Sequence, residues 1–110
     1  MARANSDLLR GTIDLLVLQV VAKAPLHGYA IGQHIEQLTD EVLQIEQGSL
    51  YPALYRLERN GWMKSSWRKT NTNRKAKFYE LTTQGRRHLE EELETWTTFT
   101  EAVSRVLPGG

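Results

Sequence analysis

The chain has 110 residues, of which 40% are hydrophobic and 25% are charged, a balance typical of one folded domain and unlike a disordered chain. Cysteine is absent, which excludes disulfides, thiol nucleophiles and cysteine-ligated zinc. No apolar run approaches the ~20 residues needed to span a bilayer, and the first residues lack a secretory signal pattern. We therefore expect a cytoplasmic protein with no membrane partner.

The first part of the chain predicts two helices. Apolar residues recur at helical spacing from residue 7 to residue 24, where Pro25 would stop the helix. Residues 28–38 predict a shorter amphipathic helix, with Ile31, Ile35 and Leu38 on its buried side. Residues 42–45 alternate weakly, which predicts a short edge strand. The small residues Gly28 and Gly32 of this shorter helix permit the close crossing that a helix-turn-helix pair requires.

A third helix is expected to begin between residues 46 and 49 and to end at Asn60 and Gly61. Because Pro52 belongs in a first turn, we expect Ser49 to be the cap, with an irregular first turn as the alternative. A helical wheel separates a wholly apolar face from a polar face that carries two tyrosines. Tyrosine hydroxyls and guanidinium groups suit a helix that lies against phosphates and base edges, whereas a plain solvated face is the alternative. The apolar face comprises Leu50, Ala53, Leu54 and Leu57, and the polar face comprises Tyr51, Pro52, Tyr55, Arg56 and Arg59.

Residues 62–69 and 75–81 predict two strands, joined by a polar loop whose asparagines tolerate positive φ. Tyr79 and Leu81 share the face that we expect to pack inward. Six of the 14 Lys and Arg residues lie between residues 62 and 79, where there is no Asp or Glu, although the net charge is only +1. This local charge predicts a basic wing that meets a polyanion, with a solvated face as the alternative.

The last helix is expected to run from a Thr82 or Thr83 cap to about residue 107. Counted through Thr100, its residues Leu89, Leu93, Trp96, Val103 and Leu107 fall at alternating spacings of four and three, which is typical of a coiled-coil-like seam that Phe99 and Val106 widen. Because the preceding residues provide too little core to cover so long a helix, we expect a second copy to cover it in a twofold homodimer. The expected dimerisation residues are Leu89, Leu93, Trp96, Phe99, Val103 and Leu107.

These elements predict a mainly α fold with a small β-hairpin, namely a winged helix-turn-helix followed by a dimerisation helix. We expect residues 1–82 to form the DNA-binding domain and residues 83–110 the C-terminal dimerisation helix, as one compact unit. His27, His34 and His88 are too scattered for a metal site, so no metal or cofactor is expected. No Gly-rich phosphate loop or nucleophile and base pair supports an enzyme.

Four motifs in this order resemble the PadR family of bacterial transcriptional regulators, over about residues 8–90. They are GTIDLLVLQVVA at 11–22, HGYAI at 27–31, GSLYPALYRLE at 48–58 and RKAKFYELT at 74–82. The short single C-terminal helix resembles the compact subgroup of that family. The chain departs from the family pattern at Glu46, where a capping serine is common, at Asn73, where a wing-tip glycine is usual, and at Ala76, where an arginine is common.

The resemblance implies a dimeric repressor that occupies a partly palindromic double-stranded DNA operator and leaves it when an effector binds. Its two recognition helices would lie about one helical turn of DNA apart, roughly 34 Å. The DNA-binding residues are expected to be Gln47, Ser49, Tyr51 and Pro52 in or beside the major groove, Tyr55 and Arg56 on the same helix, and Arg74, Lys75 and Lys77 on the wing.

Trp96 is a candidate effector-binding residue, because related multidrug-sensing members stack flat aromatic ligands between facing tryptophans. Packing in the dimer seam is the alternative for Trp96. The other two tryptophans, Trp62 and Trp67, flank the first hairpin strand and are expected to be structural, one of them as a platform for the hairpin.

A second hypothesis is a winged-helix protein-interaction module that lacks specific DNA binding. Glu46 and Ala76 favour it, because a carboxylate faces phosphates unfavourably and the missing arginine removes a phosphate contact. Arg56 and Arg59 could also pair with local acids such as Glu58, since surface ion pairs are common.

Overall fold

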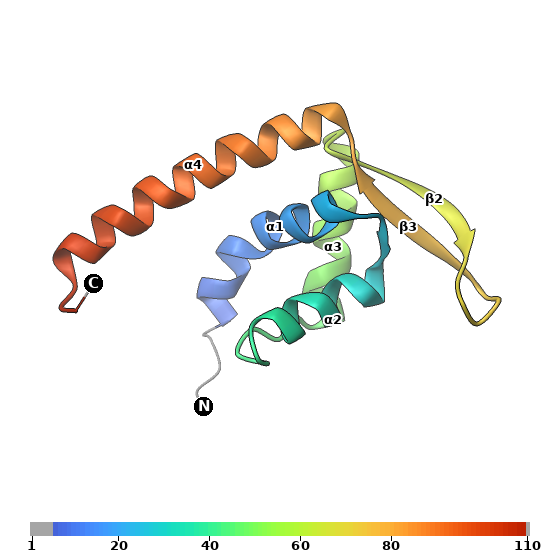
Figure 1. Ribbon diagram of the computed structural model, residues 1–110, viewed down its shortest axis with the longest axis horizontal. Helices are drawn as coiled ribbons and strands as arrows, with labels where there is room; N and C mark the ends of the chain where they lie inside the picture. The colour runs from blue at the N-terminus through green and yellow to red at the C-terminus, as the bar shows by residue number, and fades with distance from the viewer. Residues whose placement is uncertain (1–5, 110) are drawn as a thin grey trace.

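The computed structural model describes residues 6–109, with side chains described from residue 12 onward. The elements in chain order are α1 (Ser6–Lys23), β1 (Leu26–His27), α2 (Gly28–Leu38), α3 (Gln47–Arg59), β2 (Met63–Lys69), β3 (Lys75–Leu81) and α4 (Thr83–Val106). Helices α1, α2 and α3 form the body (Figure 1). The β2–β3 hairpin projects from one side of this body and most of α4 projects from the other.

The fold is a winged helix-turn-helix, mainly helical with a small antiparallel sheet, as the sequence predicted. The bounds of α2 match the prediction, and α4 begins after a Thr82 cap whose hydroxyl accepts a hydrogen bond from the Gly85 amide at 2.9 Å. Gly61 follows α3 with φ of +80°, and Asn73 takes φ of +65° in the hairpin loop. Both conformations agree with the residue types, because glycine and asparagine enter the left-handed region most readily.

The third strand of the sheet lies where the sequence analysis placed only a break between helices. Leu26 and His27 pair antiparallel with Tyr79 and Phe78, so the strand order is β1-β3-β2. The strand predicted at residues 42–45 is wrong, because that segment is a bend followed by irregular chain that leads into α3. A two-residue strand is too short to show alternation, and its pairing depends on the partner strand rather than on its own residues.

Helix α3 begins before the predicted Ser49 cap, so that prediction is wrong. The N-cap is Glu46, whose side chain makes no capping hydrogen bond, and the Ser49 and Leu50 amides donate to the Glu46 carbonyl, both at 2.9 Å. Pro52 consequently lies inside the helix, where its nitrogen has no hydrogen to donate. Burial of the apolar face offsets this cost, because tertiary packing outweighs intrinsic helix propensity.

The core lies between the three body helices and the sheet, and all four predicted apolar residues of α3 are buried in it. Tyr79 and Leu81 are buried as predicted, each 6% exposed. Leu38 is 67% exposed, so the prediction that it packs inside is wrong. It is the last residue of α2, where the helix has already run past the core.

The start of α4 is bound tightly to the turn that follows α3. The Thr82 hydroxyl donates to the Gly61 carbonyl at 2.6 Å, and the Thr82 amide donates to the Trp62 carbonyl at 3.1 Å. The Trp62 indole stacks on the His88 ring, with centroids 3.5 Å apart and planes inclined by 10°. A Cβ on Gly85 would lie 1.9 Å from the Trp62 carbonyl oxygen, so this approach requires glycine. These contacts set the direction in which α4 leaves the body.

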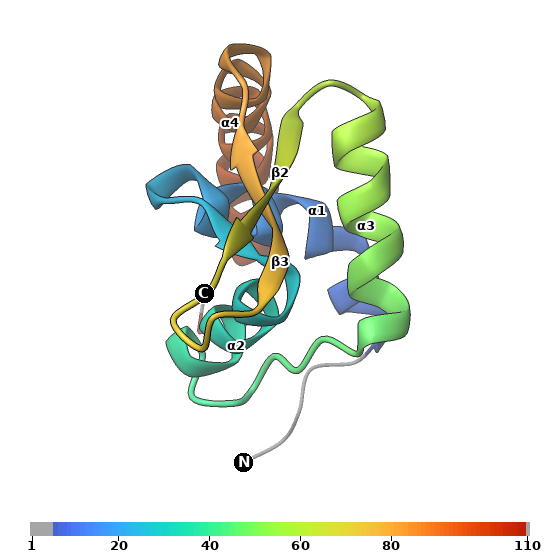
Figure 2. The ribbon, with the colours of Figure 1, turned by 90° about the vertical axis from the view of Figure 1, so that its right-hand side faces the viewer.

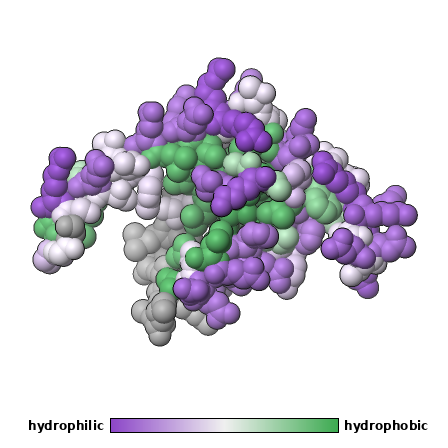
Figure 3. Space-filling model, viewed as in Figure 1, coloured by the Kyte–Doolittle hydropathy of each residue, from purple (hydrophilic) through white to green (hydrophobic). Residues whose placement is uncertain are grey.

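Beyond its first turns, α4 extends away from the body with an apolar side uncovered. Leu89 is buried in the chain's own core, whereas Leu93, Trp96 and Phe99 are 38%, 41% and 59% exposed. Figure 3 shows hydrophobic surface beneath the junction of α4 with the body and again at the tip of the helix. Exposed apolar side chains on successive turns of one helix are typical of a surface that another molecule covers.

Candidate nucleic-acid interface

The outer face of α3 presents the polar residues that the sequence analysis assigned to DNA. The buried face of the helix holds it against the body, and the helix lies beside the hairpin on one side of the molecule (Figure 2). Of the two tyrosines, Tyr51 is 43% exposed and Tyr55 is 66% exposed. The exposed residues of this face are Gln47, Ser49, Tyr51, Pro52, Tyr55, Arg56 and Arg59.

Tyr51 is only half exposed because its ring rests against the start of α2. A Cβ on Gly28 would lie 2.9 Å from the Tyr51 Cε1 atom, so the missing side chain at Gly28 makes room for the ring. His27, the residue before Gly28, caps α2 by accepting a hydrogen bond from the Ala30 amide at 3.3 Å. The hydroxyl edge of the ring thus lies against the start of α2, because the Tyr51 oxygen would be 3.1 Å from the same Cβ.

Arg56 has a partner within the chain, as the sequence analysis allowed. Its Nη2 atom donates to Oδ1 of Asp14 on α1 at 2.8 Å, and the two side chains are 51% and 42% exposed. An exposed ion pair of this kind contributes only about 0 to 1 kcal/mol. Loss of the ion pair with Asp14 would therefore cost little free energy if the Arg56 guanidinium moved to a phosphate.

Glu58 joins α3 to the base of the hairpin. Its carboxylate accepts a hydrogen bond from the Ser65 hydroxyl at 2.6 Å and pairs with Lys77 Nζ at 3.4 Å. The same Nζ lies 5.7 Å from the centre of the Tyr79 ring. Burial raises the pKa of the Tyr79 hydroxyl above its ordinary value, while the Lys77 charge acts in the opposite direction. Through these two contacts Glu58 links α3 to both strands of the hairpin.

We expect Glu58→Ala to lower the free energy of unfolding by about 1 kcal/mol, because it removes a charge-assisted hydrogen bond and an ion pair at a partly exposed site. Urea denaturation followed by circular dichroism measures the change. Glu80→Ala is the matched control, since Glu80 lies on the other face of the hairpin and meets only exposed cations. An equal or larger loss for the control would contradict the linking role of Glu58.

The six cations of the hairpin are not equivalent in the folded chain. On one face, Lys64 and Arg68 approach the Glu80 carboxylate at 4.0 and 3.5 Å, and Arg68 also lies over the Phe78 ring at 5.6 Å. Lys77 is paired with Glu58 on the other face. Lys69, Arg74 and Lys75 are exposed and make no ion pair with the residues that the structure describes. Positive charge is therefore concentrated toward the tip.

A basic wing beside an exposed tyrosine-bearing helix suits DNA, and comparison with known proteins identifies the family. The model of the transcriptional regulator PadR-like family matches residues 17–91, which is more than half of the chain. The chain belongs to the PadR-like family. This family consists of transcriptional regulators rather than enzymes, in agreement with the sequence analysis.

Solved structures share the fold of this PadR-like regulator over nearly its whole length. A transcriptional regulator from Clostridium thermocellum is 29% identical, with a TM-score of 0.83 over 93% of this chain and 96% of that one. A PadR family transcriptional regulator from Eggerthella lenta is 33% identical, with a TM-score of 0.77 over 94% of this chain and 88% of that one. Protein X of Lysinibacillus sphaericus is 28% identical over 105 residues, which cover 96% of each chain.

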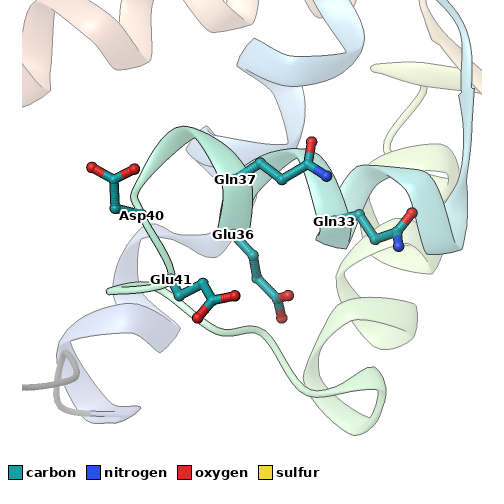
Figure 4. Close-up of a pocket in the computed structure, with 5 residues that line it drawn as sticks. All are labelled: Gln33, Glu36, Gln37, Asp40 and Glu41. Atoms are coloured by element: carbon teal, nitrogen blue, oxygen red, sulfur yellow. The ribbon is translucent and has the colours of Figure 1, made fainter.

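A different part of the PadR-like regulator is acidic. A shallow depression of about 550 Å³ is lined by residues from the end of α2 and the following turn, and Asp40 points away from Glu36 and Glu41 there (Figure 4). Carboxylates repel phosphates, so this surface is unsuited to DNA. The lining residues are Gln33, Glu36, Gln37, Asp40 and Glu41.

Within residues 6–109, no three His, Cys, Asp or Glu side chains gather as a metal site, and no helix is long and apolar enough to cross a bilayer.

Three residues that shape the interface of this PadR-like regulator were missed or incompletely described from the sequence. Asp14 carries no local signal for its pairing with Arg56, because the two residues come from different helices. Glu58 was considered only as a partner for the arginines of its own helix. Gly85 did carry a signal, since a glycine inside a predicted helix lowers helix stability and therefore suggests a close backbone contact.

Proposed function

We propose that this PadR-like regulator binds double-stranded DNA as a homodimer and represses transcription from a partly palindromic operator. The observation that carries the proposal is the juxtaposition of the exposed polar face of α3 with the unpaired cations of the wing among the described residues. In this arrangement α3 enters the major groove and the wing follows the flanking phosphates. The proposed contacts are Gln47, Ser49, Tyr51, Pro52, Tyr55 and Arg56 on α3, and Arg74, Lys75 and Lys77 on the wing.

Dimerisation through α4 is the second part of the proposal. We assign residues 1–82 to the DNA-binding domain and residues 83–110 to dimerisation. Leu89 lies in the chain's own core and acts by holding the helix in place, so the contact between protomers begins beyond it. A twofold axis through the two helices would present both α3 helices to one side of a duplex, roughly 34 Å apart. The contact residues are Leu93, Trp96, Phe99, Val103 and Leu107.

Release from DNA by a small flat aromatic effector is the third part of the proposal. Trp96 is 41% exposed on the apolar side of α4, and the Phe99 ring centroid lies 6.3 Å from its own. In a twofold dimer these rings would face their copies across the axis and form an aromatic slot. Quenching of Trp96 fluorescence by such ligands, and its loss in Trp96→Phe, tests this part.

The proposed function is tested by sequencing the genomic fragments that the purified protein retains. A repressor of this kind enriches fragments that share a palindrome, and its affinity falls steeply as salt is raised. Absence of any enrichment at low salt would overturn the proposal.

One observation favours a second candidate, a protein-interaction module: Glu46 is exposed at the N-cap of α3, where its carboxylate would repel phosphate. Weak, sequence-independent DNA binding that an acidic protein displaces would support that candidate.

We expect Arg74→Ala to weaken binding to every DNA sequence alike, because a phosphate contact carries no base information. The slope of log affinity against log salt should fall in magnitude by about 0.9, the contribution of one neutralised phosphate. Fluorescence anisotropy at several salt concentrations measures both quantities. Arg105→Ala is the control, since Arg105 is an exposed cation in the last turn of α4, far from the wing. An unchanged slope for Arg74→Ala would place this arginine outside the contact.

A further inference from the structure

A large aromatic side chain on the wing is uncovered by its own chain. Trp67 is 69% exposed, the highest value among the aromatic residues whose side chains the structure describes. We expected a structural role for Trp67, but Trp62 anchors the hairpin by stacking on His88. Exposure of most of an indole to water is unfavourable, because its ring system is one of the largest apolar surfaces in proteins.

The strand register places Trp67 on the face of the wing that is turned toward α3. Alternate residues of β2 share a face, so Trp67 lies on the side of Met63, which is buried, and of Ser65, which donates to Glu58 of α3. Its direct partner across the strands is Lys77, which pairs with the same carboxylate. Trp67 therefore extends the exposed surface of α3 outward along the hairpin.

The free cations of the strands lie on this same face. Lys69 and Lys75 are the next cross-strand pair toward the tip, and neither has an ion-pair partner among the described residues. Like charges directly opposite each other are destabilising, and a bound polyanion would relieve them. On the reverse face Glu80 already meets Lys64 and Arg68. The surface around Trp67 is consequently apolar and positively charged together.

A second copy of the chain does not account for this exposed tryptophan. The wing and the outer part of α4 project from opposite sides of the body (Figure 1). A partner seated on the exposed apolar side of α4 therefore leaves Trp67 in solvent. The occupant of the Trp67 surface must instead complement a flat apolar ring flanked by cations, and the sugar-phosphate backbone of DNA has both an apolar sugar and negative charge.

We propose that Trp67 is a DNA-contacting residue whose indole packs against a deoxyribose of the backbone, while Lys69 and Lys75 meet the adjacent phosphates. This inference rests on the proposed function and adds to it an apolar contact that is independent of base sequence. The ring face suits the sugar, and the indole N–H is available to donate to a phosphate oxygen. With Trp67, the wing offers DNA an apolar contact in addition to the positive charge of its basic residues.

The affinity test compares Trp67→Ala with Leu38→Ala on a mixed-sequence duplex at low ionic strength. We expect Trp67→Ala to weaken binding about tenfold, as loss of a tryptophan from a contact typically does. The slope of log affinity against log salt should stay unchanged, because the lost contact is apolar. Leu38 is 67% exposed at the end of α2, so Leu38→Ala should bind like the unsubstituted protein. Thermal melting by circular dichroism should be unchanged for both variants.

A second measurement follows the tryptophan directly by comparing the unsubstituted protein with Trp67→Phe, which retains Trp62 and Trp96. We expect the duplex to protect the fluorescence of the unsubstituted protein from acrylamide quenching, and Trp67→Phe to remove that protection. Unchanged affinity for Trp67→Ala, or undiminished quenching of Trp67 in the complex, would overturn the inference and leave the proposed function standing. Failure of the unsubstituted protein to bind any duplex would overturn both.

Discussion

Replacement of Gly85 by alanine is expected to lower the free energy of unfolding by about 3 kcal/mol, the upper range for an overpacked site. The new Cβ would lie 1.9 Å from the Trp62 carbonyl oxygen and 2.8 Å from its carbon. These atoms belong to the backbone, so relief requires α4 to move relative to the turn after α3. The higher helix propensity of alanine, about 1 kcal/mol, opposes this loss but is too small to cancel it.

Gly48→Ala provides the matched control for this substitution. Gly48 also lies in a helix, and a Cβ built on it would meet no atom within 4 Å. The two variants therefore differ in tertiary contact and share the change in residue type, so Gly48→Ala should leave stability unchanged or slightly raised. Urea denaturation of both variants measures the difference. Wild-type stability in Gly85→Ala would show that the joint between α4 and the body is not rigid.

Introduction of a charge on the apolar side of α4 is expected to separate the proposed dimer. In Phe99→Glu, the carboxylate would have to be buried against the partner helix, which is costly without a counter-charge. Each monomer would then hold only one half-site, and we expect affinity for a palindromic duplex to fall about 100-fold, because the second contact is no longer intramolecular. Analytical ultracentrifugation and fluorescence anisotropy measure the two effects on one sample.

Thr98→Glu is the control for the dimer prediction. Thr98 is exposed on α4, and its place in the heptad is opposite the apolar seam. The same charge on the same helix should therefore leave both the mass and the affinity unchanged. A monomeric unsubstituted protein would contradict the dimer, and a dimeric Phe99→Glu variant would show that the protomers meet through another surface.

The periodic part of the fold could be predicted well from local pattern. The apolar residues of α3 recur at helical spacing and all four are buried, while the alternation of β3 correctly places Tyr79 and Leu81 inside. The family motifs span the elements that the comparisons match. Periodicity succeeds here because each of these faces is buried against a single core, so the pattern in the chain mirrors the environment directly.

Single-residue features at the ends of elements were harder to predict. Ser49 satisfies the residue preference for a helix cap, yet α3 starts at Gln47 and its N-cap is Glu46, whose side chain makes no capping hydrogen bond. Leu38 fits the apolar stripe of α2 but lies past the edge of the core. Residue preference at a terminus is worth about 1 kcal/mol, which is less than the packing of a buried helix face, so packing determines where the helix begins.

For the candidate interface, the residue types along the chain established which segments are exposed, aromatic and basic, and the DNA contacts assigned to them stay predictions. The residue types did not establish which cations are free of ion pairs, because both acids involved lie outside the basic segment. Glu58 reaches Lys77 through the packing of α3 on the hairpin. Glu80 reaches Lys64 and Arg68 through the strand register. The setting of α4 against the turn at Trp62 likewise arises from a long-range backbone contact. Local sequence encodes the period of each element, whereas charge pairing and the angles between elements depend on residues brought together from distant positions.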